Sequence, residues 1–185
     1  MMVRMLPPMK KLVFAADELY QNQRLDQLIH SYITSEYPNI EYERLVGKEE
    51  NSRRLQEYLL ADDPTTSILF STWFYERKNL FGSPTLISGD FQLVASSPQP
   101  VFALRGAYIN KAGFIGGHFY DQAELEQSLT NIIGQMLQGK EMRDIPFVYS
   151  KKSYPLVNYA QLKLDELDAD LCPSGTIFLN KPLTF

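Results

Sequence analysis

Two stretches decide the fold: SILFSTWFYE at residues 67–76 and PVFALRGAYINKAGFIGG at residues 100–117. Each begins with a short apolar run, which is typical of a buried strand in an α/β sheet. Each run then ends in aromatic and charged residues, and open α/β sheets bind ligands at the carboxyl ends of their strands. The two stretches therefore predict a site-bearing α/β unit. They contain no complete catalytic signature, so the sequence indicates a class of function and leaves the ligand unnamed.

The residues before this region predict two pairs of a strand and a helix. The apolar run KLVFAAD, residues 11–17, is typical of a buried parallel strand, and residues 40–46 alternate like a strand near the sheet edge. Between them an apolar stripe predicts a helix that packs on the sheet and ends before Pro38: Leu25, Leu28, Ile29, Tyr32 and Ile33. We predict that Asn51 or Ser52 caps the second helix. Its inward-facing residues would be Leu55, Tyr58 and Leu59.

The connector between the two stretches predicts a third helix. Ile87, Phe91 and Val94 have helical spacing, although Gly89 weakens the pattern. A buried strand is expected at residues 100–104, and a short strand or turn with three glycines at residues 113–119.

The strongest helical pattern follows Asp121, which can cap the helix, and Gly139 marks its carboxyl end. Beyond residue 140 a proline-containing tail carries a short helix near 159–164 and an apolar strand at 176–179. The order βαβαβαββα before this tail predicts an α/β fold with three layers around an open, mainly parallel sheet. We expect a single lobe over residues 1–185.

Composition excludes several classes of function. A net charge of -4 without a long basic cluster argues against a nucleic-acid partner. Cys172 is the only cysteine, which excludes an internal disulfide and a multi-cysteine metal site. The chain has no apolar run long enough to span a membrane, and residues 1–11 lack the apolar core of an export signal. We therefore expect the chain itself to be soluble.

Several segments together resemble a known family. They are the first strand and helix, the STW strand end, PVFALRGAYI with GFIGG, the helix up to Gly139, DIPF at 144–147 and PSGTIFLNKPLTF at 173–185. This set resembles the periplasmic sensor region of two-component sensor histidine kinases, which is similar to type I periplasmic (ABC-type) substrate-binding proteins. The pairing of DIPF with a terminal PxGxIxxNKPxxF pattern is its most specific part.

The resemblance implies a flavodoxin-like lobe of a type I periplasmic-binding-protein-like domain, with a returning segment from about residue 113 to residue 185. In such proteins two lobes close on a small ligand, and the movement passes across a membrane to a kinase. The kinase lies outside this chain, so no enzymatic activity is expected of this fragment. The resemblance places it on the periplasmic side of a membrane-anchored parent protein.

Two departures from the family bear on the ligand. A complete two-lobe domain would need roughly another hundred residues before Lys11, so the chain resembles the second lobe with its returning segment. Relatives often carry an acidic residue after the strand equivalent to PVFAL, where this chain has Arg105 and Gly106. A carboxylate for sugar hydroxyls is therefore missing at that position.

The candidate ligand-binding residues follow the predicted strands: Asp17, Glu18, Trp73, Tyr75, Glu76, Arg105 and Tyr108. Asp17 and Glu18 could bind a cation or ligand hydroxyls, or simply cap the next helix. Trp73 could form an aromatic shelf or pack in the core. We expect these residues to gather at the carboxyl ends of the strands.

Other chemistry has weak support in the sequence. Gly113, Gly116 and Gly117 could cradle a phosphate, but they form no recognised phosphate motif and favour a tight turn. The chain's two histidines, His30 and His118, are too isolated for a metal site. Neither Ser71 nor Ser153 lies in a nucleophile elbow. Cys172 has no histidine nearby in the sequence pattern that would indicate a catalytic partner. We predict no catalytic residue, metal or cofactor.

Two rival classes share the α/β pattern. A receiver-like phosphoacceptor needs an aspartate at the end of the third strand, where this chain has Ser71, Thr72 and Trp73. A flavodoxin-like nucleotide-binding domain needs a phosphate loop after the first strand, where AADELYQNQ contains no glycine. Both alternatives are therefore less favoured than a ligand-sensing lobe.

The helix at residues 121–138 predicts an interface. Its apolar face would normally pack against the first lobe: Leu125, Leu129, Ile132, Ile133, Met136 and Leu137. Without that lobe the face must either fold back onto this chain's own sheet or pack against a second copy. We favour a homodimer formed through Leu125, Leu129, Ile132, Ile133 and Met136.

Overall fold

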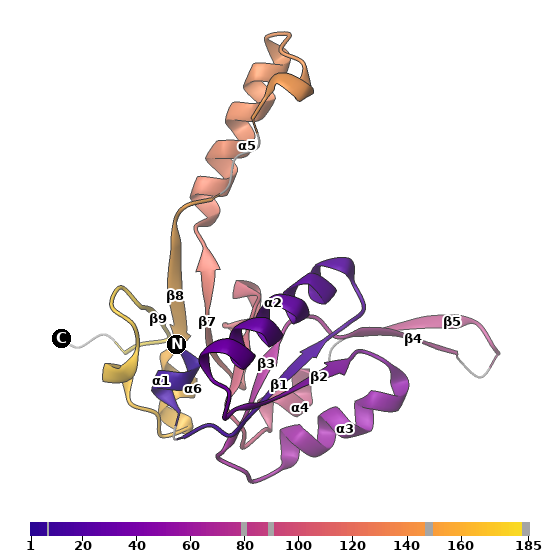
Figure 1. The fold of residues 1–185 in the computed structure, drawn as a ribbon, viewed down its shortest axis with the longest axis vertical. Helices are drawn as coiled ribbons and strands as arrows, with labels where there is room; N and C mark the ends of the chain where they lie inside the picture. Colours follow the sequence, from indigo (N-terminus) through magenta and orange to yellow (C-terminus); the bar gives the residue numbers. More distant parts are fainter. Residues whose placement is uncertain (7, 79–80, 89–90, 147–149, 183–185) are drawn as a thin grey trace.

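A seven-stranded sheet forms the centre of the computed structural model (Figure 1), which describes residues 1–185 except 7, 79–80, 89–90, 147–149 and 183–185. The strand order is β2-β1-β3-β6-β7-β8-β9. Its strands are β1 (Lys11–Ala16), β2 (Glu41–Val46), β3 (Thr66–Phe70), β6 (Val101–Ala103), β7 (Phe114–Tyr120), β8 (Ser153–Asn158) and β9 (Ile177–Leu179). The sheet is parallel from β2 to β7, β8 runs antiparallel to β7, and β9 runs parallel to β8. The predicted α/β class, the mainly parallel sheet and the edge position of residues 40–46 are confirmed.

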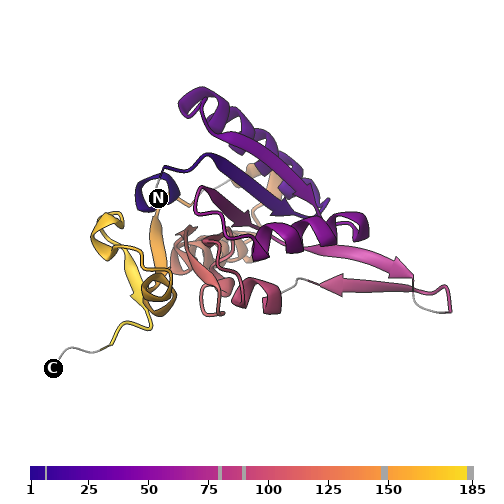
Figure 2. The same cartoon turned by 90° about the horizontal axis from the view of Figure 1, so that it is seen from below.

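Helices cover both faces of this sheet (Figure 2). Those that pack on it are α1 (Met2–Met5), α2 (Tyr20–Glu36), α3 (Glu49–Leu60), α4 (Phe91–Ala95) and α6 (Tyr159–Leu164), whereas α5 (Gln122–Leu137) lies beyond the sheet. The described 3-10 turns are η1 (Gly106–Tyr108), η2 (Met142–Asp144) and η3 (Ala169–Leu171). Val13 and Ala15 of β1 pack in one buried cluster with α3 and α4, whereas Leu12 packs in another with α1, α2 and α6. This alternation follows from the period of a strand, and it creates the three layers.

The helix α2 carries the predicted stripe, but only part of that stripe reaches the sheet. Ile33 is buried, and Ile29 packs beside it. Leu28 and Tyr32 are exposed, at 65% and 58%, so the prediction that they pack on the sheet is wrong. The two side chains line a groove on this face of the sheet.

The predicted third helix is confirmed at Phe91 and Val94, which lie in α4, and is wrong at Ile87, which lies in a strand; Gly89 lies outside the described residues. Residues 74–78 and 84–88 form an antiparallel hairpin of β4 (Phe74–Lys78) and β5 (Pro84–Ser88), and only α4 is helical. Strand residues Thr85 and Ile87 are β-branched, which favours pairing, and Gly82 takes a φ of 75° in the turn between the strands. The hairpin extends from the carboxyl edge of the sheet (Figure 1).

The predicted cap of α3 is also wrong. Lys48 occupies the cap position, and the helix begins at Glu49. The amide of Asn51 donates to the carbonyl of Val46 at 2.9 Å, and the Ser52 hydroxyl donates to the carbonyl of Lys48 at 3.2 Å, so neither side chain accepts from the first turn. Two glutamates in the first turn, Glu49 and Glu50, complement the positive end of the helix instead.

The strand β8 was not predicted, because proline usually interrupts a strand. Pro155 pairs in register with His118 of β7, but β9 pairs only with the residues from Leu156 onward. Pro155 therefore lies on a part of β8 with a single strand neighbour, where proline is tolerated. The predicted short helix near residues 159–164 and the terminal strand are confirmed as α6 and β9.

The strands β7 and β8 lead away from the layered body to α5, which stands beyond their ends (Figure 1). Its predicted ends are confirmed: Asp121 accepts from the amides of Ala123 and Glu124 at 2.9 and 3.3 Å, and Gly139 has a φ of 90°. Glu124 accepts from the backbone amides of Lys151 and Lys152, both at 2.9 Å, which ties the helix base to the returning chain.

The apolar stripe of α5 is uncovered. No residue of the helix is buried, and Leu129 and Leu137 are 58% and 84% exposed. The alternative in which this helix folds back onto the chain's own sheet is therefore wrong. Among the described helices, none combines the length and the apolar character that a membrane crossing requires.

Candidate functional site

The carboxyl ends of three neighbouring strands meet at one edge of the sheet. Asp17 follows β1, Ser71 and Thr72 follow β3, and Arg105 with the turn η1 follows β6. Because these strands are parallel neighbours, the residues that follow them share this edge. The edge therefore brings together residues that are far apart in the sequence.

Asp17 is buried at this edge, with 2% of its surface exposed. Its Oδ1 accepts from the Leu19 amide at 3.0 Å and from Asn22 Nδ2 at 2.6 Å. Its backbone amide donates to the carbonyl of Thr72 at 2.7 Å. Its second carboxylate oxygen, Oδ2, is buried and has no hydrogen-bond partner among the described residues. The carboxylate is thus held in one orientation while half of its acceptor capacity is unused.

Asn22, in the first turn of α2, joins β1 and β3 at this point. It is fully buried, and its Nδ2 donates to Thr72 Oγ1 at 2.9 Å as well as to Asp17. Its Oδ1 accepts from the hydroxyl of Ser71 at 2.8 Å. Sequence reasoning missed this residue, because an amide at the start of a helix belongs to no periodic pattern. Asn22 can contact all three residues because the ends of β1 and β3 lie side by side in the sheet.

A cavity of about 430 Å³ adjoins Asp17, within the size range of small-molecule sites. It is lined by Asp17, Glu18, Leu19, Phe74, Tyr75, Glu76 and Leu86. Asp17, Glu18, Tyr75 and Glu76 were singled out from the sequence, whereas Leu19, Phe74 and Leu86 were not. The hairpin of β4 and β5 supplies one wall. The cavity therefore depends on a hairpin that was not predicted from the sequence.

The other predicted site residues do not line this cavity. Trp73 is 3% exposed and packs in the core cluster, which corresponds to the packing alternative for this residue. Tyr108 is half-buried against Phe70 and Phe114. Burial raises the pKa of the Tyr108 hydroxyl, the charge of Arg105 lowers it, and the charge of Asp17 raises it. Tyr108 therefore lies within electrostatic reach of both Arg105 and Asp17, and neither Arg105 nor Tyr108 is in the wall of the cavity.

Two basic residues of the neighbouring chain segments already have partners. Arg44 pairs with Asp26 at 3.1 Å and donates to the backbone carbonyl of Asp17 at 3.3 Å. Lys48 pairs with Glu18 at 3.0 Å, in an exposed position. Neither cation forms a hydrogen bond or an ion pair with the Asp17 carboxylate among the described contacts.

The glycines considered for phosphate binding have structural roles. Gly113 has a φ of 87° and precedes β7, so it lies at the amino edge of the sheet, opposite the cavity. Side chains at Gly116 and Gly117 would approach the carbonyls of Leu156 and Ala103 at 2.6 and 2.2 Å. Within the described part of the chain, no group of three or more His, Cys, Asp or Glu side chains could hold a metal ion.

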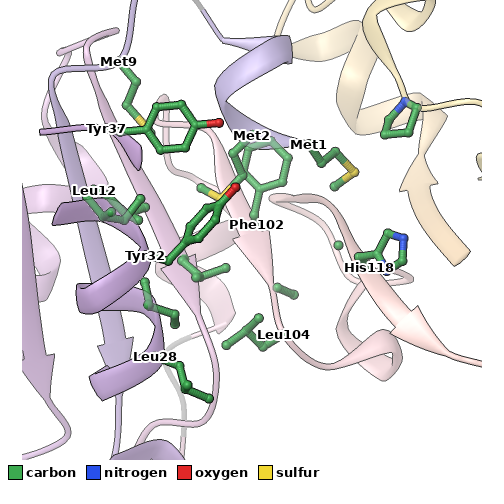
Figure 3. A pocket seen from close by; sticks show the side chains of 16 residues that line it. Met1, Met2, Met9, Leu12, Leu28, Tyr32, Tyr37, Phe102, Leu104 and His118 are labelled. Atoms are coloured by element: carbon green, nitrogen blue, oxygen red, sulfur yellow. The ribbon is translucent and has the colours of Figure 1, made fainter. Parts of the chain in front are cut away.

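A second hollow lies on the α2 face of the sheet (Figure 3). Its volume is about 550 Å³, and its wall is mainly apolar. Figure 3 shows Met1, Met2, Met9, Leu12, Leu28, Tyr32, Tyr37, Phe102, Leu104 and His118 around it. The lining residues include no Asp, Glu, Lys or Arg. This apolar groove is larger than the first cavity, and it reaches the end of β6 at Ala103 and Leu104. Its lining lacks convergent charged groups, so we take the cavity beside Asp17 as the candidate site.

Comparison with known proteins was informative only at the level of structure. No protein-family model matches the chain, and no curated protein sequence matches it. A similar solved structure is the ligand-free, open form of a substrate binding protein with adhesive properties from Clostridium difficile, with a TM-score of 0.61 and 12% sequence identity. The match covers 96% of this chain and 57% of that protein.

The chain has a substrate-binding-protein-like fold. At 12% identity the likeness concerns the path of the backbone. The flavodoxin-like lobe expected from the sequence matches this binding-protein-like architecture, with a parallel sheet between helical layers. The chain spans 57% of the length of the similar protein.

Proposed function

We propose that this chain is the extracytoplasmic ligand-sensing lobe of a two-component sensor histidine kinase. The cavity beside Asp17 carries the proposal, because it lies at the carboxyl edge where open α/β sheets bind ligands. Four residues of its wall are also candidates from the sequence alone: Asp17, Glu18, Tyr75 and Glu76. In this proposal the chain binds a small molecule and has no catalytic activity of its own.

The signalling role is supported by the sequence resemblance, above all by DIPF at 144–147 and the terminal PSGTIFLNKPLTF segment at 173–185. Ligand closure would move this lobe relative to a first lobe, and the movement would pass to a kinase module outside the chain. The lobe would lie on the periplasmic side of a membrane-anchored parent protein. The body of the lobe connects to α5 through β7 and β8, which offers a direct path for such movement.

We further propose that α5 is an interface, either with the first lobe or with a second copy, and we favour the homodimer. Its exposed stripe supports this, since Leu125, Leu129, Ile133 and Met136 are each at least 40% exposed and Ile132 is half-buried. A monomer rarely leaves such a continuous apolar surface in water. A self-complementary helix face closes with two-fold symmetry.

A receiver-like phosphoacceptor is the main rival, and the carboxyl edge gives it little support. The residues after β3 are Ser71 and Thr72, and the side chains of both are bonded to Asn22. Transfer of a phosphoryl group to an aspartate would require a carboxylate at that strand end. Asp17 lies at the end of β1, so it does not supply the phosphate-accepting aspartate that such a site needs at the end of β3.

The test is a ligand screen followed by two-dimensional NMR of the ¹⁵N-labelled 185-residue chain. Sugars, amino acids, amines and flavins are screened by thermal shift, with Mg²⁺ plus acetyl phosphate as the rival probe. We expect weak hits that perturb the amides of Leu19, Tyr75 and Leu86, because a single lobe encloses a small ligand incompletely.

Two results would contradict the proposal. One is that every hit perturbs only His118 and its neighbours in the apolar groove. The other is a shift that depends on acetyl phosphate, which favours the phosphoacceptor. Submicromolar affinity of the isolated chain would contradict the proposal that this lobe supplies only one side of the ligand-binding cleft.

A further inference from the structure

We infer that the cavity beside Asp17 selects an organic cation, an ammonium or guanidinium group carried on an aromatic or aliphatic body. This inference rests on the proposed ligand-binding function and specifies its ligand class. It follows from three features of the cavity: the charge of its wall, an unused buried acceptor, and the apolar surface around them.

The wall is negative. Asp17, Glu18 and Glu76 line the cavity, and its lining residues include no Lys, Arg or His. The exposed pair of Lys48 with Glu18 is a weak interaction, because such pairs contribute little in water. An entering anion would be repelled by Asp17 and Glu76, which have no cationic partner among the described contacts, whereas a cation would be attracted to them.

Asp17 supplies the fixed acceptor. It is 2% exposed, and its Oδ2 has no hydrogen-bond partner among the described residues. A buried acceptor without a partner costs free energy, which a donor from the ligand would recover. The bonds from Leu19 and Asn22 occupy Oδ1 and prevent the carboxylate from turning away. Because Asp17 lines the cavity, the charge of this fixed carboxylate acts on a ligand there, and a charged N–H donor that reached the buried Oδ2 would satisfy it.

The rest of the wall suits the body of such a ligand. Phe74 and Tyr75 are aromatic, and Leu19 and Leu86 are aliphatic. Aromatic rings also attract cations through their faces, which adds to the preference for positive charge. A cavity of about 430 Å³ has room for a compact molecule of this kind. The amphipathic wall thus matches a ligand with one cationic end and one apolar end.

Three compounds with the same ring and different head groups isolate the charge: 2-phenylethylammonium, 2-phenylethanol and phenylacetate. Each is titrated into the ¹⁵N-labelled chain while the amides of Leu19, Tyr75 and Leu86 are followed. We expect the amine to bind at least about tenfold more tightly than the alcohol, since the ammonium adds charge–charge attraction to its hydrogen bond with a carboxylate and the neutral hydroxyl does not. Phenylacetate should not perturb these amides.

Variants assign the effect to the carboxylates. Asp17→Asn keeps the shape and the acceptor for Leu19 but removes the charge, and we expect it to abolish the preference for the amine over the alcohol. Glu76→Gln, at an exposed wall position, should reduce the preference by a factor of about two to three. Glu57→Gln is the matched control, because Glu57 is exposed on α3 and pairs with Arg53. It should leave all three titrations unchanged.

The outcomes separate this inference from the proposed function. Equal or tighter binding of the alcohol or phenylacetate at the same amides overturns the cation preference and leaves ligand binding intact. An amine preference that survives in both Asp17→Asn and Glu76→Gln also overturns it. If no compound in the wider screen perturbs the cavity, the proposed function fails and the inference fails with it. Should Asp17→Asn not fold, Glu76→Gln alone decides, and an unchanged preference there counts against the inference.

Discussion

Asn22 Nδ2 lies 2.6 Å from Asp17 Oδ1, and this bond fixes the first turn of α2 to the end of β1. The same amide group donates to Thr72 and accepts from Ser71, so one side chain joins three segments of the carboxyl edge. A buried amide with partners on both its oxygen and its nitrogen holds its surroundings in one arrangement. The orientation of the Asp17 carboxylate in the candidate site depends on it.

Replacing Asn22 by alanine should therefore destabilise the protein. The change removes one of the two bonds to Asp17 Oδ1 and leaves the hydroxyls of Ser71 and Thr72 without the Asn22 amide, and each buried unsatisfied group costs about 1–3 kcal/mol. We expect a loss of about 3 kcal/mol in the free energy of unfolding, measured by urea denaturation. Asn131→Ala on the exposed surface of α5 is the control and should change stability by less than about 0.5 kcal/mol. A loss below about 1 kcal/mol for Asn22→Ala would contradict the importance of this network.

The fold could be predicted where the signal was local. The strands β1 and β2 and the helices α2 and α5 were predicted because their periodicity is complete within each segment. The hairpin of β4 and β5 was missed because Ile87, Phe91 and Val94 also match helical spacing, and only strand pairing decides between the two structures. The strand β8 was missed because Pro155 resembles a strand breaker until its single neighbour is known.

Some residues of the candidate site could likewise be predicted from the sequence, and others could not. Asp17 and Tyr75 could be found because they follow buried strands, and a general rule places ligands there. Asn22 and Leu86 could not, since their positions depend on how α2 and the hairpin meet the sheet edge. Trp73 was a candidate because an aromatic side chain can form a shelf for a ligand. It packs in the core instead, because a large aromatic side chain gains most from burial.

Asp165 predicts a specific pH dependence of stability. Burial raises the pKa of this carboxyl to about 6, although the hydrogen bond from Gln161 opposes the shift. The folded state therefore binds the proton more tightly than the unfolded state, whose aspartates titrate near the usual value of about 3.9. The associated stability is fully present below about pH 4 and is lost as the pH rises through about 6.

Asp165→Asn should retain this stability at high pH. We expect the variant to be more stable than the wild type by about 1 kcal/mol at pH 7.5, a value reduced from the full shift because the site is partly exposed to solvent. The difference should shrink at pH 4.5. Urea denaturation at both pH values measures it, and Asp170→Asn, at an exposed position in η3, is the control. A variant that is equally stable or less stable than the wild type at pH 7.5 would contradict the raised pKa.

Two glycines should respond in opposite directions to alanine. Gly113 has a φ of 87°, and a Cβ there would lie 2.1 Å from the carbonyl oxygen of Val94. Gly134 lies inside α5 with nothing within 4 Å of an added Cβ. We expect Gly113→Ala to destabilise the protein by more than about 2 kcal/mol, through strain and a backbone clash.

Gly134→Ala should instead raise the helix content of α5, because alanine is favoured over glycine in a helix by about 0.5–1 kcal/mol. Amide hydrogen exchange along α5 measures this effect locally, while urea denaturation measures the global effect of Gly113→Ala. Similar stabilities for Gly113→Ala and the wild type would show that the turn before β7 can relax.

The exposed apolar stripe of α5 predicts that the chain forms a dimer. Fully burying a large aliphatic side chain contributes about 1.5–3 kcal/mol, so an association that covers several of them can be stable. We expect the wild-type chain to form a dimer in size-exclusion chromatography with light scattering. The double variant Leu129→Glu with Ile132→Glu should be a folded monomer, because an interface cannot bury two carboxylates without partners. Its far-ultraviolet circular dichroism should match that of the wild type.

The control for this variant places the same charges elsewhere on the helix. Gln127 and Asn131 are exposed and bond each other at 3.0 Å, away from the apolar stripe. Gln127→Glu with Asn131→Glu should therefore remain a dimer if the stripe forms the contact. A wild-type chain that stays monomeric at every concentration would exclude the homodimer and leave a first lobe as the partner of α5. Dissociation of both double variants would show that net charge, and not the position of the stripe, controls the association.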